Sequence, residues 1–198
     1  EICACLVGSE MCIRDRASLA RLLRQSISNE DETVLIGQEI QYVKSYLTIQ
    51  KMRYKDKLEF EIHVDPSIMN THIVKLTLQP IVENAFKHGI SPKEEGGVVR
   101  IRINPLRDKG LLYISVCDNG VGIQPEQLAQ LKAALAQPGE RWEHIGVYNV
   151  AARLRLLDKR GRLVIRSHPG RGTAISMYLP LVELLEEDLD DDTPVDRG

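Results

Sequence analysis

The chain opens with two stretches in which apolar residues recur at helical spacing. The first lies within residues 17–28, and the second runs from Ile36 to Tyr54 at intervals of four and three residues. Both spacings place their apolar members on one face of an α-helix. The second stretch has two interpretations. Its helix packs on its own domain, or it docks on a helix of a partner chain, because an average spacing of 3.5 residues suits paired helices.

Beyond residue 57 the pattern changes to a mixture of strands and helices. Apolar and charged residues alternate along residues 58–64, which predicts a half-buried strand. The same reasoning, with turn residues between the segments, predicts further strands at 98–104, 111–117, 162–167 and 173–179. Helical patterns predict helices at 73–88, 125–136 and 146–157.

Both ends of the chain lie outside this pattern. Residues 1–16 match neither period, and part of them resembles translated sequencing-adaptor sequence, so we expect a leader that is non-native or disordered. Residues 183–198 are strongly acidic, which predicts a solvated, disordered tail. No apolar run approaches the ~20 residues that span a bilayer, so we expect no direct membrane contact by this fragment.

Composition and charge exclude several classes of function. The 198 residues are 43% hydrophobic and 27% charged, as in soluble globular proteins. A net charge of −2 gives no general attraction to nucleic acid, so we expect no nucleic-acid partner. The four cysteines form no Cys-x-x-Cys pair, which argues against a zinc site or a disulfide framework and favours a cytosolic protein.

One face of the helix expected at 73–88 carries candidate chemistry. Asn84, Lys87 and His88 stand at i, i+3 and i+4, so an amide, an ammonium and an imidazole share that face. Such a set can ligate a magnesium ion, neutralise phosphate and lie against a base. An exposed amphipathic helix would show the same pattern.

A second candidate follows the strand at 111–117. Gly120 and Gly122 free the backbone to approach a flat ligand, and Asp118 can accept a hydrogen bond from an exocyclic amine. The segment lacks the third glycine of a dinucleotide-binding fingerprint and the Lys-Ser/Thr pair of a P-loop.

Two further segments contain glycine. Gly146 and Val147 open the helix at 146–157, and backbone N–H groups at a helix start form a phosphate site. A glycine-rich turn precedes Thr173, although a simple hairpin would also explain it.

Taken in order, these blocks resemble the N, G1 and G2 boxes and the terminal Gly-x-Gly-Thr of an ATPase superfamily. Its members are gyrase, chaperone, mismatch-repair and histidine-kinase ATPases. The resemblance covers about residues 58–181 and implies a two-layer α/β sandwich, the Bergerat ATP-binding fold, with a mixed sheet and helices on one face. We expect this domain at 58–182, preceded by an N-terminal helical segment.

Three segments resemble the LytS/YesM type of sensor histidine kinase more narrowly: EIQYVKSYLTIQKMRY (39–54), LQPIVENAFKHG (78–89) and IGVYNV (145–150). This resemblance implies that residues 17–57 end a dimerisation and acceptor region. It also implies a set of positions that bind ATP and Mg²⁺, namely Asn84, Lys87, His88, Asp118, Gly120, Gly122, Ile123, Gly146, Val147 and Thr173.

The same resemblance implies a role for most of these residues. Asn84 would hold Mg²⁺ and Lys87 would contact phosphate, and these two are the expected catalytic residues. His88 would border the adenine, and Asp118 would accept from its amine, supported by Thr173 through water. Gly120 and Gly122 would shape the adenine pocket, and Gly146 and Val147 would meet the phosphates beneath a lid at 124–144.

Two departures from the family pattern matter. His144 stands where many relatives carry another glycine, and none of the five histidines lies in the Pro-His-Phe context of the family's phosphate acceptor. Pro80 stands four residues before Asn84, where hydrolytic members of the superfamily carry a glutamate that activates water.

The expected function is therefore the ATP-binding catalytic domain of a two-component sensor histidine kinase. It would transfer the ATP γ-phosphate to a histidine on a helix missing from this fragment, for relay to a response regulator. The parent would be a homodimer anchored at the cytoplasmic face of the plasma membrane. The alternatives are an anti-sigma-factor-type serine kinase and a non-enzymatic, ATP-gated interaction module.

Overall fold

A five-stranded mixed sheet forms one layer of the fold in the computed structural model, which describes residues 33–136 and 145–181. Its strands, in spatial order, are β2 (Leu58–Val64), β4 (Gly97–Leu106), β5 (Leu111–Asp118), β7 (Gly172–Pro180) and β6 (Arg162–His168). Strand β2 runs parallel to β4, and every other neighbouring pair is antiparallel. All five strands expected from the alternation are confirmed, with ends that differ by at most two residues.

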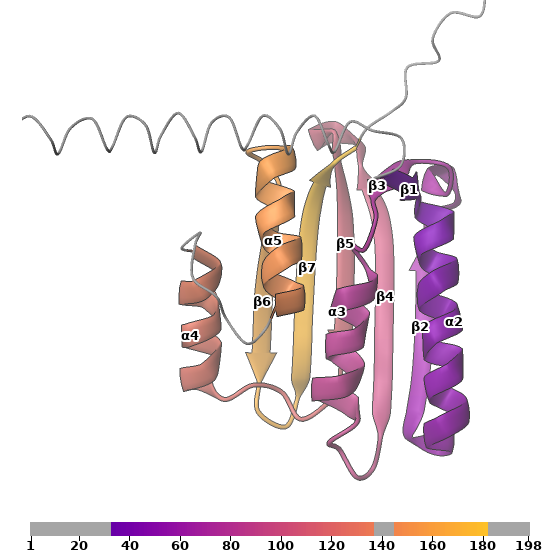
Figure 1. The fold of residues 1–198 in the computed structure, drawn as a ribbon, viewed down its shortest axis with the longest axis vertical. Helices are drawn as coiled ribbons and strands as arrows, with labels where there is room; N and C mark the ends of the chain where they lie inside the picture. The colour runs from indigo at the N-terminus through magenta and orange to yellow at the C-terminus, as the bar shows by residue number, and fades with distance from the viewer. Residues whose placement is uncertain (1–32, 137–144, 182–198) are drawn as a thin grey trace, which may run out of the picture.

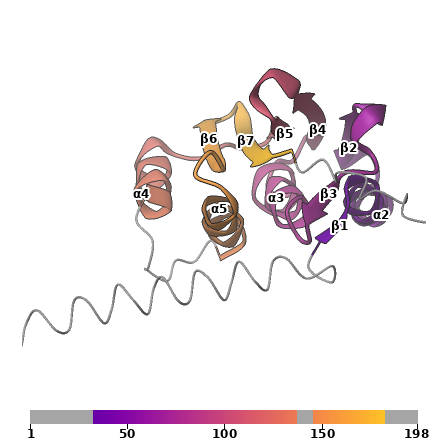
Figure 2. The same cartoon turned by 90° about the horizontal axis from the view of Figure 1, so that it is seen from above.

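The second layer consists of helices that cover one face of this sheet (Figures 1 and 2). They are α2 (Ile36–Tyr54), α3 (Gln79–Asn84) and α5 (Ile145–Leu157), and α4 (Pro125–Ala136) lies beside α5 at the β6 edge of the sheet. Short 3-10 turns occur at η2 (Lys55–Lys57), η3 (Pro66–Ile68) and η5 (Arg107–Lys109). The expected two-layer α/β sandwich is thus confirmed. Among the described residues, no helix is long and apolar enough to cross a membrane.

The prediction of a helix at 73–88 is wrong for the first residues of that segment. A three-residue strand, β3 (His72–Val74), pairs there with β1 (Thr33–Leu35) in a separate antiparallel ribbon. Leu76 then has a φ of 60°, a left-handed conformation that a continuous helix cannot include. Strands of three residues are too short for alternation to distinguish them from helix, so the sequence pattern could not show the ribbon.

The second part of that segment is helical but changes its winding. Helix α3 begins at Gln79 with Pro80 in its first turn, where a missing N–H costs little. It continues as the π-helix η4 (Ala85–Ile90), in which Ser91 N–H donates to Phe86 O across five residues. A π-turn is wider than an α-turn, so successive side chains in this part are separated by a smaller angle than α-helical spacing assumes.

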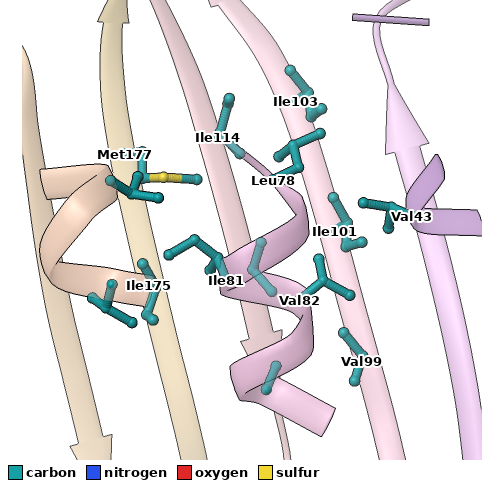
Figure 3. Packing of buried hydrophobic residues seen from close by; sticks show 14 of the residues in the cluster. Val43, Leu78, Ile81, Val82, Val99, Ile101, Ile103, Ile114, Ile175 and Met177 are labelled. Atoms are coloured by element: carbon teal, nitrogen blue, oxygen red, sulfur yellow. The ribbon is translucent and has the colours of Figure 1, made fainter. Parts of the chain in front are cut away.

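Packing between the two layers forms the core (Figure 3). Val99, Ile101 and Ile103 of β4 are completely buried against the helical layer, whereas Arg100 and Arg102 between them are exposed. Ile81 and Val82 lie over the sheet from α3 and are also completely buried. The buried side chains, which alternate with exposed ones along the strand, therefore pack against the apolar face of α3, the helix that carries Asn84.

Helix α2 packs on its own domain. Ile36, Val43 and Leu47, which belong to the apolar stripe read from the sequence, have no exposed surface. This confirms the first of the two interpretations. Three large apolar side chains are exposed on the other side of the helix, Tyr42, Ile49 and Met52, among polar residues such as Gln38 and Ser45.

Two substitutions on α2 test this docking. Leu47→Ala should lower the free energy of unfolding by about 2–4 kcal/mol, because it opens a cavity at a fully buried site. Ile49→Ala, two residues away and 62% exposed, should cost less than about 0.5 kcal/mol. Urea denaturation of both variants measures the difference. Equal and small costs would show that α2 is not docked on the domain.

Candidate functional site

A cavity of about 580 Å³ lies between the helical layer and the ends of β5, β6 and β7. Its volume falls within the range of about 300–1,000 Å³ that is typical of small-molecule sites. The residues that line it are Ile81, Asn84, Ala85, His88, Gly89, Val116, Asp118, Gly122, Ile123, Gln127, Gln130, Leu131, Val147, Ile165, Thr173 and Ile175.

Asp118, at the end of β5, is the acidic residue of this lining. Its Oδ1 accepts hydrogen bonds from the backbone N–H groups of Gly120 (2.9 Å) and Thr173 (3.2 Å). Burial raises the pKa of the Asp118 carboxyl, and these two hydrogen bonds oppose the rise. Because both bonds end on Oδ1, Oδ2 keeps lone pairs for a ligand that donates a hydrogen.

Glycine permits the backbone contacts that surround Asp118. A Cβ on Gly120 would lie 2.2 Å from the carbonyl carbon of Gly89, in η4, and one on Gly172 would lie 2.0 Å from the carbonyl oxygen of Asp118. Gly172 also has a φ of 96°, which side chains rarely allow. Val121 N–H donates to Gly89 O (3.0 Å) and closes the contact between the loop and η4. Any side chain at Gly120 or Gly172 would force these segments apart.

A hydroxyl pair supports the floor of the cavity. The hydroxyls of Thr173 and Ser167 are 2.8 Å apart, and Ser167 Oγ also donates to Gly172 O (2.9 Å) and accepts from Ile123 N–H (2.9 Å). Sequence reasoning missed Ser167. The expected hairpin pointed to it, because Ser167 stands opposite Thr173 in the β6–β7 register. The water-mediated support of Asp118 by Thr173 stays a prediction, since the contact seen here uses the backbone of Thr173.

Asn84 is held in place at the cavity wall. Its Nδ2 donates to the carbonyl oxygen of Pro80 (2.7 Å), which leaves Oδ1 as the acceptor atom of the amide. A Cβ on Gly146 would lie 3.2 Å from the same Nδ2, so the start of α5 lies directly beside Asn84. The absence of a side chain at position 146 lets the N-terminus of α5 approach α3.

Lys87 does not line the cavity, although His88 does. Its Nζ lies 3.1 Å from Glu83 Oε2, and its side chain is 59% exposed. The hydrogen bond from Gln79 and then the contact with Lys87 lower the pKa of the Glu83 carboxyl. Lys87 is thus paired with Glu83 one helical turn earlier, whereas Asn84 and His88 line the cavity, and the contact of Lys87 with phosphate stays a prediction.

The remaining expected residues lie at the site. Gly122, Ile123 and Val147 line the cavity, and Gly120 and Gly146 make the close contacts behind its walls. Sequence reasoning missed Gln127 and Gln130 of α4, which line it as well. Their spacing of three residues on a helix was the available signal. In the segment 124–144, where a lid is expected, residues Pro125–Ala136 form helix α4. Residues 137–144, including His144, lie outside the described residues.

Comparison with known protein families identifies the class of this domain. Residues 70–183 match the family model described as "Histidine kinase-, DNA gyrase B-, and HSP90-like ATPase", and the chain belongs to that family. Residues 10–58 match a second model, "Histidine kinase", which covers α2 and the segment before it.

Curated relatives are sensor kinases. The chain is 36% identical over 164 residues to sensor histidine kinase YpdA of Escherichia coli (strain K12), covering 82% of this chain and 27% of the relative. It is 32% identical over 165 residues to an uncharacterized sensor-like histidine kinase of Staphylococcus epidermidis, covering 83% and 31%. Sensor protein kinase HptS of Staphylococcus aureus is 30% identical over 82% of this chain and 31% of its own length. The chain thus spans less than a third of the length of these relatives.

Solved structures share the fold. The histidine kinase domain of the Erythrobacter litoralis EL346 blue-light activated histidine kinase aligns with a TM-score of 0.52 at 17% identity, covering 75% of this chain and 62% of that one. Full-length ShkA in complex with AMPPNP aligns with a TM-score of 0.54 at 19% identity, covering 75% and 30%. The α/β sandwich is therefore the histidine-kinase type of ATPase fold.

Asp118→Asn should raise the free energy of unfolding of the ligand-free protein at pH 7. The substitution removes a charge that burial disfavours and keeps an oxygen that can accept from Gly120 and Thr173. A carboxyl whose pKa is raised on folding favours the folded state most below its unfolded pKa of about 3.9, and this benefit is lost as the pH rises through the folded pKa. The advantage of the variant should therefore grow from pH 4 to pH 7. Urea denaturation across this range checks it, and a variant that is less stable throughout would contradict the prediction.

Proposed function

We propose that this chain is the ATP-binding catalytic domain of a two-component sensor histidine kinase. The parent protein transfers the ATP γ-phosphate to a histidine outside this sequence, for relay to a response regulator. The observation that carries the proposal is the Asp118 carboxylate, held by two backbone N–H groups at the end of a cavity of nucleotide size, in a member of this ATPase family.

The cavity suits an adenine base. Asp118 accepts a hydrogen bond from the exocyclic amine, and such a bond to a charged group contributes about 1.5–3 kcal/mol. Apolar side chains from both layers, among them Ile81 and Ile175, offer the flat faces of the base a dry surface. His88 borders the base from η4, and Gly122 keeps the loop close to it.

The phosphates fit at the start of α5. The N–H groups of Gly146 and Val147, in the first turn of α5, and the positive end of the helix dipole favour an anion there. Lys87 reaches a phosphate after exchanging its Glu83 partner, which its exposed and flexible side chain permits.

Mg²⁺ fits this site through one amide. The described residues contain no group of three or more His, Cys, Asp or Glu side chains that could hold a metal ion on its own. Magnesium commonly keeps several waters and binds through one or two protein oxygens and the substrate phosphates. Asn84 Oδ1 is such an oxygen, because Nδ2 of the same amide is engaged by Pro80. When bound, the ion neutralises phosphate charge.

The chain disfavours hydrolysis of its nucleotide. Pro80, which precedes Asn84 by four residues, offers a backbone carbonyl but no side-chain base. Glu83 is engaged by Gln79 and Lys87 and does not line the cavity. A general base contributes typically 10²–10⁴-fold, so water is a poor nucleophile in this site. An incoming histidine brings its own nucleophilic nitrogen.

The exposed apolar residues of α2 support the remaining parts of the proposal. Tyr42, Ile49 and Met52 suit contact with a further helix, as in a region that dimerises the parent and carries its acceptor. The match of residues 10–58 to the histidine kinase model favours this function over a serine kinase. A homodimeric parent anchored at the cytoplasmic face of the plasma membrane belongs to the same proposal.

Phosphotransfer in trans tests the proposed function. The purified chain with γ-labelled ATP should turn over nucleotide slowly and retain no stable label. Adding a separately produced acceptor helix from its parent should label that helix with an acid-labile product, as phosphohistidine is. Asn84→Ala should abolish this labelling, whereas Glu59→Gln, on the exposed side of β2, should not change it.

Rapid ATP turnover by the chain alone would contradict this account. An acid-stable phosphoserine would favour the serine-kinase alternative, and ATP binding without any transfer would favour the interaction module.

A further inference from the structure

A carboxylate on α2 is buried away from the ATP site. Glu39 is 4% exposed, and both of its oxygens accept hydrogen bonds from backbone N–H groups. Oε1 accepts from Leu76 (2.8 Å) and Oε2 from Leu78 (3.0 Å). A charge at this depth is tolerated because both oxygens are satisfied by groups that would themselves be costly to leave unpaired. Glu39 thus joins α2 to the segment 75–78, which leads into α3.

The backbone of this segment has an unfavourable conformation. Leu76 has a φ of 60°, a left-handed conformation whose free energy is higher for a residue with a side chain than for glycine. The large apolar side chain of Leu76 is also 50% exposed. Neither feature favours the observed geometry. The hydrogen bond from Leu76 N–H to Glu39 does, so the carboxylate helps to hold the segment in place, together with the buried hydroxyl of Thr77, which donates to Val74 O (2.7 Å).

The same segment contacts a second helix of the ATP site. Arg153 of α5 donates through its guanidinium to the carbonyl oxygen of Lys75. Segment 75–78 therefore links three helices: α2 through Glu39, α5 through Arg153, and α3 through the chain itself. Asn84 lies on α3, and the start of α5 lies beside it. These bonds connect α2 to both helices that are proposed to hold the phosphates and the metal ion.

We propose that Glu39 is a positioning residue through which the placement of α2 sets the affinity of the site for Mg²⁺-ATP. The inference rests on the proposed function, because it takes ATP as the ligand and α2 as the end of the acceptor region. Coupling of this kind is reciprocal: bound ATP favours the docked position of α2, and docked α2 favours ATP.

Glu39→Gln is the first test. Glutamine keeps the size of the side chain but places an NH₂ group against one of the two backbone donors. Isothermal calorimetry at a temperature where the variant is folded should show Mg²⁺-ATP binding weakened roughly three- to tenfold. Glu59→Gln makes the same chemical change on an exposed strand position and should leave the affinity unchanged.

The second test is whether Leu76→Gly restores ATP binding in the Glu39→Gln variant. We expect this rescue if Glu39 positions the segment, and not if Glu39 only stabilises the fold. Glycine adopts a positive φ without a steric cost, so the segment needs Glu39 less. In the Glu39→Gln background it should return the ATP affinity to within about twofold of the Leu76→Gly variant alone. Failure of this rescue would overturn the proposed route through Leu76.

Arg153→Met tests the same connection between α2 and the ATP site if the Glu39→Gln variant does not fold. It removes the link from the α5 side and leaves the core intact, and it should weaken ATP binding to a similar extent. Wild-type affinity in a folded Glu39→Gln protein, or in Arg153→Met if the former is unfolded, would overturn this inference alone. A wild-type chain that does not bind Mg²⁺-ATP would instead overturn the proposed function.

Discussion

Around Asp118, three backbone segments approach one another more closely than side chains allow. The π-helix η4, the loop after β5 and the start of β7 meet there, and the glycines at their contacts leave no room for a Cβ. This approach brings the N–H groups of Gly120 and Thr173 to a carboxylate that has lost part of its hydration. The constraint fixes where η4 lies relative to the sheet, and with it Asn84 and His88 at the cavity wall.

Other parts of the domain supply the free energy of folding that stabilises this arrangement. Partial burial of Asp118 disfavours its charged form. The sheet and the helical layer supply the stability through closely packed aliphatic residues on β4, β5 and α3. Helix α2 adds to this core with one face and exposes Tyr42, Ile49 and Met52 on the other, where we propose that another helix docks.

Much of this organisation could be predicted from the sequence. Period-two alternation located the five strands of the main sheet, because each has a covered and an open face. Helical spacing located α2, α4 and α5. The resemblance to the histidine-kinase ATPases implied one site for Asn84, His88, Asp118, Gly122, Ile123, Val147 and Thr173, and these residues line one cavity. The register of the β6–β7 hairpin places Ser167 opposite Thr173, so the presence of Ser167 at the site could also have been predicted.

What the sequence could not show depends on local departures from regular structure. The β1–β3 ribbon has three-residue strands, and the left-handed Leu76 follows a pattern that reads as helix. Lys87 pairs with Glu83, one helical turn earlier, a contact that α-helical spacing allows but that the choice of Lys87 as a phosphate contact did not take into account. Glu39 appears as an ordinary polar position of an amphipathic helix, and its bonds to residues 37 and 39 positions away emerge only in the folded chain.

The central claim is that the cavity recognises adenine through the Asp118 carboxylate. The most direct measurement is a calorimetric comparison of Mg²⁺-ATP with Mg²⁺-GTP on the wild-type chain. Adenine presents an amine to the carboxylate, whereas guanine presents a carbonyl oxygen at the equivalent position, so the two acceptors would face each other unpaired. The account predicts that ATP binds at least about tenfold more tightly than GTP, since an unpaired buried acceptor costs about 1–3 kcal/mol. Equal affinities for the two nucleotides would contradict it.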